Sequence, residues 1–145
     1  MNRFVLAVLV ATLVSACGTT APSEANLVGN WAGTLQSTES SDQSTVAFMM
    51  TLTQTGASVS GTWGVATLPF FQLANGSLSG TVTAASFSGT FTFYAPNPNG
   101  DGVCMGTFAV VGNAGANMTW TSPGWTGDCT GLPTNITINV QGPNS

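Results

Sequence analysis

The sequence predicts an all-β domain, an eight-stranded antiparallel up-and-down β-barrel, with a two-sheet β-sandwich as the alternative. From Leu27 onward, apolar residues alternate with Ser and Thr in short segments, and Gly, Asn, Pro and Asp separate these segments. Such alternation is typical of strands that bury one face and expose the other, and the separating residues favour turns. No window of the sequence has the spacing of an amphipathic helix.

The predicted strands follow one another along the chain and each has one large apolar face. In order, they cover residues 27–36, 45–54, 58–67, 77–84, 86–95, 103–112, 117–122 and 134–141. The inward residues predicted from the alternation include Leu27, Trp31, Leu35, Val46, Phe48, Met50, Leu52, Val59, Trp63, Val65, Leu78, Val82, Phe87, Phe91, Phe93, Phe108, Val110, Met118, Trp120, Ile136, Ile138 and Val140.

A short repeat also supports a barrel. An inward Gly, an outward Thr and an inward large residue recur, as in Gly33-Thr34-Leu35, and again from Gly61, Gly80, Gly89 and Gly106. Glycine inside a strand marks a tight bend or the close approach of another backbone, so its repetition predicts strong curvature. A barrel that spans the outer membrane shows the opposite polarity, with apolar residues outward.

Residues 1–16 have the features of a secretory signal peptide: a basic start at Met1-Asn2-Arg3, a short apolar run, and small residues before a cleavage site. Val14-Ser15-Ala16-Cys17 resembles the lipobox of bacterial lipoproteins. This resemblance implies cleavage before Cys17, a diacylglycerol on its sulfur, acylation (a palmitate-type chain) of the new N-terminus, and anchorage in a membrane. Gly18 after the lipidated cysteine, rather than Asp, resembles the outer-membrane sorting pattern of diderm cell envelopes; in a monoderm host the protein would stay on its only membrane. Residues 17–26 are then a lipidated, flexible tether and 27–142 the β-barrel domain.

Composition excludes several classes of function. After Arg3 the chain contains no Lys, Arg or His, while its five acidic residues remain, so the mature side chains carry a net charge of −5. Nucleic-acid binding depends on basic residues that neutralise phosphates, and we expect none. Without histidine, the common nucleophilic and metal-bound catalytic sites cannot form, so no enzyme activity, cofactor or metal is predicted.

Two cysteines remain once Cys17 is assigned to lipid. Cys104 and Cys129 are an even pair in an oxidising compartment, and we predict a disulfide bond between them, with two buried free thiols as the alternative.

Gly29-Asn30-Trp31 resembles the Gly-x-Trp signature of the calycin group, which includes lipocalins and avidins, and the segment 54–63 resembles the turn and following strand of an avidin-type barrel. The resemblance implies a lipocalin/avidin-like barrel. Ala32-Gly33-Thr34 does not match the Asn and Ser with which avidins contact biotin, so the resemblance implies no particular ligand.

In an eight-stranded meander the longer connections, at 37–44, 68–76, 96–102 and 123–133, all lie at one end, which forms a mouth. Phe70, Phe71 and Trp125 make two of these connections unusually apolar. One hypothesis is that a small, mainly apolar ligand binds between inward side chains with these three at the mouth. The candidate inward contacts are Trp31, Phe48, Met50, Trp63, Phe91 and Phe108.

The alternative hypothesis is that the same side chains fill the barrel completely. The protein is then a structural or interaction lipoprotein that engages a protein or envelope partner through its loops. The inward glycines leave room for a ligand, whereas inward aromatic residues more often form a core.

Overall fold

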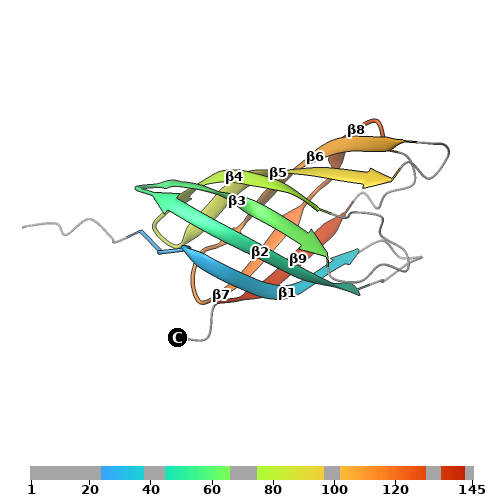
Figure 1. The fold of residues 1–145 in the computed structure, drawn as a ribbon. Helices are drawn as coiled ribbons and strands as arrows, with labels where there is room; N and C mark the ends of the chain where they lie inside the picture. Colours follow the sequence, from blue (N-terminus) through green and yellow to red (C-terminus); the bar gives the residue numbers. More distant parts are fainter. Residues whose placement is uncertain (1–23, 38–44, 66–74, 97–101, 130–134, 143–145) are drawn as a thin grey trace, which may run out of the picture.

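The computed structural model describes residues 24–37, 45–65, 75–96, 102–129 and 135–142, which form an antiparallel up-and-down β-barrel (Figure 1). Its strands are β1 (Gly29–Ser37), β2 (Thr45–Thr55), β3 (Ser58–Val65), β4 (Asn75–Thr83), β5 (Ser86–Pro96), β6 (Val103–Asn113), β7 (Asn117–Ser122), β8 (Trp125–Gly127) and β9 (Ile136–Gln141). The predicted barrel is confirmed. Within the described ranges, no helix is long and apolar enough to cross a membrane.

The sheet closes on itself through its first and last strands. Each strand from β1 to β6 pairs with the next, β1 also pairs with β9, β9 pairs with β7, and β7 pairs with β6. Closure removes the free edges that an open sheet would expose, and it excludes the two-sheet sandwich.

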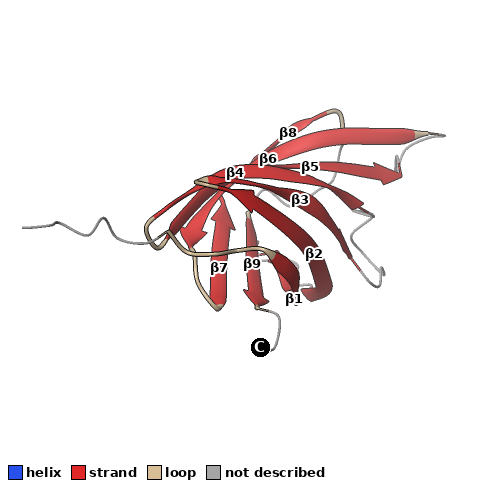
Figure 2. Ribbon diagram, turned by 60° about the vertical axis from the view of Figure 1, so that its left-hand side comes forward, coloured by secondary structure: helices blue, strands red, loops and turns tan. Residues whose placement is uncertain are grey.

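The segment after β7 corrects one prediction. Residues 123–133 were expected to be a connection, but 125–127 form β8, which pairs with β6 (Figure 2). Val111 of β6 faces Thr121 and Phe108 faces Trp125, so the three residues 122–124 oppose the two residues 109–110 between these pairs. This extra residue is a β-bulge, and β7 and β8 together act as one strand, the seventh of the eight in the barrel.

The two ends of the barrel differ. At one end, which we call the closed end, short turns at 56–57, 84–85 and 114–116 join the strands. Leu27 is fully buried there, and its N–H donates to Gln54 Oε1 at 2.8 Å. Residues 24–26 were assigned to the tether, yet the N–H of Ala25 donates to the carbonyl of Ala84 at 3.1 Å. Within the described residues, hydrogen bonding of the N-terminal segment to the barrel therefore begins at Ala25.

The opposite end, the mouth, is where the strands that flank 38–44, 66–74, 97–101 and 130–134 end or begin. In Figure 1 the closed end is on the left and the mouth on the right. The strand ends there include Ser37, Val65, Pro96 and Val103. A chain that arrives at Ala25 therefore meets the barrel at the end remote from the mouth.

Candidate functional site

The six inward residues proposed as ligand contacts lie together in the barrel interior. Trp31 comes from β1, Phe48 and Met50 from β2, Trp63 from β3, Phe91 from β5 and Phe108 from β6. Every one of them is at most 4% exposed. The alternation predicted from the sequence thus places them on the core face of their strands.

Four of these side chains contact one another. The ring of Phe48 stacks on Trp63 with centroids 5.6 Å apart, and Phe91 stacks on Phe108 at 5.0 Å. Trp63 bridges the two pairs, at 5.8 Å from Phe91 and 6.2 Å from Phe108. Such separations are those of aromatic rings in direct contact. In the middle of the barrel the candidate ligand contacts are therefore partners of each other.

Further rings extend this column toward both ends. Trp120 of β7 stacks on Phe87 of β5 with centroids 4.3 Å apart and lies 6.0 Å from Phe91. Phe93 packs at 6.1 Å from Phe108, on the mouth side of it. The sequence predicted these three residues as inward but did not single them out. Together with the four rings above they form what we call the aromatic column.

The inward glycines do not leave empty space around the aromatic column, which corrects the sequence-based interpretation. An added Cβ at Gly80 would lie 2.5 Å from Cζ of Phe87, and one at Gly89 would also lie 2.5 Å from that atom. At Gly106 the atom in the way belongs to the ring of Phe93. A ring therefore covers each of these glycines, from a neighbouring strand at Gly80 and Gly106 and from the same strand at Gly89, an arrangement that packs a core and pins strand register.

The indole N–H groups of the buried tryptophans are already used. Trp31 Nε1 donates to the Leu27 carbonyl at 2.9 Å, Trp63 Nε1 to the carbonyl of Thr92 at 2.9 Å, and Trp120 Nε1 to that of Asn113 at 2.8 Å. Buried polar groups need such partners because desolvation without a hydrogen bond is costly. These three donors fix the rings to the barrel wall and are not free to bind a ligand.

Trp125 differs from the other tryptophans. It lies on β8, is only partly buried, and packs edge-on against Phe93 with centroids 5.8 Å apart. Within the described part of the chain its indole N–H has no hydrogen-bond acceptor. It also borders a surface hollow of about 390 Å³ lined by Thr90, Thr107, Pro123 and Gly124. Phe70 and Phe71, the other two residues proposed for the mouth, lie outside the described residues, as does Cys17.

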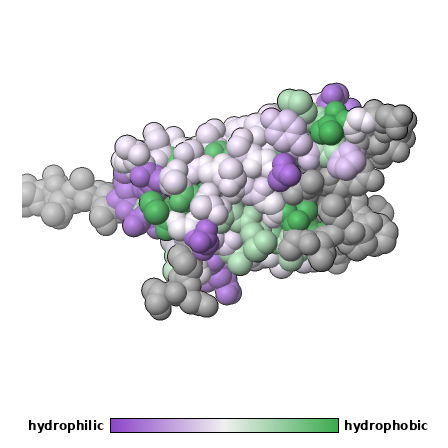
Figure 3. Space-filling view, viewed as in Figure 1, coloured by the Kyte–Doolittle hydropathy of each residue, from purple (hydrophilic) through white to green (hydrophobic). Residues whose placement is uncertain are grey.

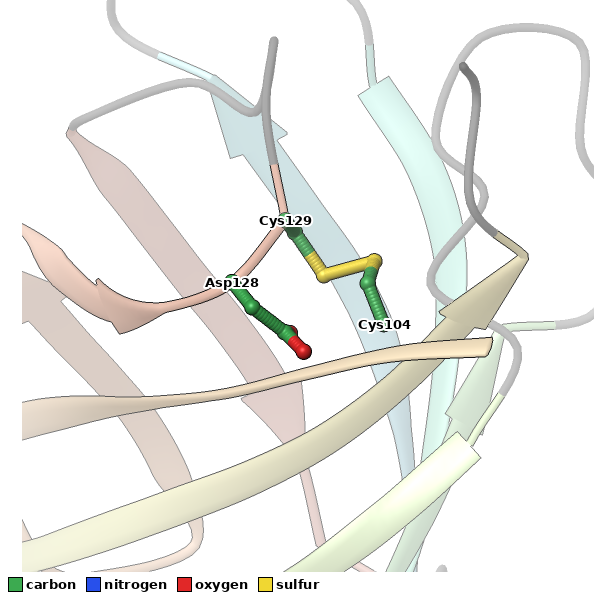
Figure 4. Close-up of side chains that lie close together, drawn as sticks. All are labelled: Cys104, Asp128 and Cys129. Atoms are coloured by element: carbon green, nitrogen blue, oxygen red, sulfur yellow. A yellow bond between two sulfur atoms is a disulfide. The ribbon is translucent and has the colours of Figure 1, made fainter. Parts of the chain in front are cut away.

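The predicted disulfide is confirmed. Cys104 on β6 and Cys129 after β8 are bonded, with their Cα atoms 5.1 Å apart (Figure 4). Asp128, beside this bond, holds the same segment: its carboxylate accepts from the Met105 N–H at 2.6 Å, and its own N–H donates to the Met105 carbonyl at 3.1 Å. The disulfide and these two hydrogen bonds fasten the end of β8 to β6.

The sulfur atoms of Cys104 and Cys129 and the carboxylate of Asp128 also lie within 4.8 Å of one another. Metal-binding cysteines act as thiolates, and here the two sulfurs are bonded to each other. The group therefore offers a cation one carboxylate, which is already engaged by a backbone N–H.

Charge is sparse on the barrel. Among the described residues, Glu24 and Asp128 are the ones with ionisable acidic side chains, and no basic side chain is present after Arg3 anywhere in the chain. The described surface is mostly Ser, Thr and Asn, as in the cross-strand hydroxyl pair of Thr107 and Thr126 at 3.0 Å.

Comparison with protein-family models, with curated proteins and with solved structures finds no match for this chain.

Proposed function

We propose that this chain is a lipid-anchored protein of the bacterial cell envelope, held in the outer membrane through Cys17, whose filled barrel presents its mouth end to a protein partner. The observation that supports a filled interior is the aromatic column, in which rings contact one another and cover Gly80, Gly89 and Gly106. A close-packed interior of this kind gives rigidity and leaves binding to the surface.

The position of the anchor supports this orientation. Ala25 and Leu27 contact the closed end, so a lipid on Cys17 attaches the barrel there. The mouth then points away from the membrane. Acyl chains contribute about 0.8 kcal/mol per buried methylene, and more than one chain holds a protein stably on a bilayer.

The anchor is tested by detergent phase partition of the full chain expressed in a diderm bacterium. We expect the wild type in the detergent phase and a Cys17→Ser variant in the aqueous phase, because only the former receives lipid. A Ser15→Thr variant is a control that keeps the cysteine. Partition of the wild type into the aqueous phase contradicts the anchor.

A second candidate function is binding of a small, mainly apolar ligand at the mouth. Trp125 favours it, because this ring is partly exposed and its N–H has no acceptor within the described residues. Aromatic side chains with a free polar tip are common ligand contacts. In this case the middle of the barrel stays filled and the ligand contacts only Trp125 and its neighbours.

Native mass spectrometry of the purified protein separates the two functions. A filled barrel gives the covalent mass alone, with and without denaturation. An additional mass that is lost on denaturation, and that is reduced in a Trp125→Phe variant but kept in a Trp120→Phe variant, supports ligand binding and contradicts the first proposal.

A further inference from the structure

An apolar patch interrupts the polar outer surface at the mouth end of β5 and β6. Tyr94 and Pro96 of β5 face Met105 and Val103 of β6 directly across the ladder. Tyr94 is 44% exposed, Val103 65% and Met105 53%, and Pro96 is also exposed. We call these four residues the β5–β6 patch. Figure 3 shows hydrophobic surface at this end of the barrel.

The patch is unusual for this surface. On the same outward face of β5 and β6, farther from the mouth, lie Ser88, Thr90, Thr92 and Thr107. The other large apolar side chains that are exposed among the described residues stand apart from one another, at Val28, Met49 and Val111. Clustered exposed apolar residues mark interaction sites, whereas single ones need no explanation.

The backbone that carries the patch is held firmly. Cys104 lies between Val103 and Met105, points inward, and is bonded to Cys129. The backbone N–H of Met105 donates to the Asp128 carboxylate, and the Met105 carbonyl accepts from the Asp128 N–H. A surface that is already ordered loses little conformational entropy when a partner binds, so its affinity is higher.

Charge indicates the chemistry of the partner. Asp128 is exposed and lies beside Met105, so an acidic group borders the patch. Asp101 lies two residues before Val103 in the sequence, and the chain contains no basic residue after Arg3. Opposite charge at the rim of an interface steers association and favours the matching partner.

Resting on the proposed function, we infer that the β5–β6 patch docks a segment of a partner protein in which apolar residues lie beside Lys or Arg. Tyr and Met are enriched in the cores of such interfaces. A lipid surface does not fit, because the patch lies at the end of the barrel opposite Ala25 and is bordered by an acidic group that anionic headgroups repel. A second copy of this chain does not fit either, because it would bring Asp128 of both copies together without a basic residue.

The test uses isotope-labelled protein purified from cells that express the full chain, with backbone amide NMR shifts as the readout. The probe is a short synthetic peptide of alternating Leu and Lys, compared with one of alternating Leu and Glu. We expect the Leu/Lys peptide to shift the amides of 94, 95, 103–105 and 128, and the Leu/Glu peptide to bind at least about tenfold more weakly.

Variants locate the contact. Met105→Thr should weaken binding of the Leu/Lys peptide about tenfold, because it removes a central apolar contact, and Asp128→Asn about threefold, less so at high salt. Val111→Thr is the matched control, since Val111 is 54% exposed on the same face of β6 but lies near the closed end. It should leave binding unchanged.

Three outcomes with the peptides overturn the inference: equal binding of both peptides, amide shifts that map elsewhere, or no shift at all. It is also overturned if phosphatidylcholine vesicles shift the same amides in place of the peptide, or if the protein self-associates through the patch as its concentration rises. Each leaves the detergent partition and the native mass measurement unaffected. The inference can therefore fail while the proposed envelope function stands. In the reverse case, the detergent partition or the mass measurement contradicts the proposed function while the peptide still binds the patch.

Discussion

The packing of rings over glycines makes a direct prediction at Gly106. A Cβ at this position would overlap Cζ of Phe93 and lie 2.6 Å from Cε1 of the same ring, while the nearest backbone atom, the Thr126 carbonyl oxygen, is 3.0 Å away. The obstacle is therefore one side chain. Gly106→Ala should destabilise the protein, and shortening Phe93 should relieve most of the cost.

The expected magnitudes follow from the geometry. Overpacking of a core costs about 1–3 kcal/mol, and replacing Gly by Ala restores about 0.4–1 kcal/mol through the unfolded chain, so Gly106→Ala should cost about 1–2 kcal/mol. Phe93→Leu alone should cost about 1–2 kcal/mol through lost contacts. In the Phe93→Leu background, Gly106→Ala should be neutral or slightly stabilising, which gives a coupling energy of about 2 kcal/mol.

The assay is urea unfolding of the four proteins of this cycle, followed by tryptophan fluorescence without reductant. Gly115→Ala is the control, because nothing lies within 4 Å of an added Cβ there, and it should change the free energy of unfolding by less than about 0.5 kcal/mol. If the effects of Gly106→Ala and Phe93→Leu are additive within about 0.5 kcal/mol, the ring does not fill the space above the glycine and the proposed packing is wrong.

Four other variants probe the barrel by the same urea assay. Replacing Cys104 and Cys129 by Ala should lower the free energy of unfolding by about 3 kcal/mol. Reductant should lower the free energy of unfolding of the wild type but not that of this variant. Ala84 has a φ of 53°, so Ala84→Gly should stabilise the protein by up to about 1 kcal/mol, and a loss of stability contradicts a left-handed turn there. Trp120→Phe should cost about 1–3 kcal/mol more than Trp125→Phe, because the N–H of the buried Trp120 donates to the Asn113 carbonyl, whereas that of Trp125 has no acceptor within the described residues; equal costs argue against this role.

Strand positions and their inward faces could be predicted because they depend on local features. The period of two that separates Phe48, Met50 and Leu52 specifies which side chains share a face whatever lies opposite them. Turn residues mark where strands end. Gly56, between β2 and β3, is an example, because its φ of 56° suits glycine. Repetition of these two local signals over the whole domain was enough to predict the barrel.

The features that were missed depend on neighbouring strands. β8 is three residues long and follows Pro123-Gly124, which resembles a turn, so only its pairing with β6 identifies it. The inward glycines indicated free space because the sequence does not show which ring lies over each one. For Gly80 and Gly89 that ring is Phe87, which comes from β5 and covers a glycine on β4 as well as one on its own strand.

The β5–β6 patch had a signal in the sequence that was not used. Along β5 the outward positions carry Ser or Thr up to Thr92, and the next two outward positions are Tyr94 and Pro96. On β6, Val103 and Met105 precede the outward Thr107. The adjacency of these departures on two strands became visible only with the register that pairs Tyr94 with Met105.

Closure of the barrel by β1 and β9 has a consequence for how the chain folds. Leu35 pairs with Ile138, so the ladder that completes the barrel joins residues more than 100 positions apart. Long-range pairing of this kind slows folding, because the entropy of closing the loop is lost before the contacts form. Until β9 arrives, the hydrogen-bonding edge of β1 stays open and can recruit another chain into an aggregate. A chain of this topology therefore completes its barrel only when its last strand pairs with its first.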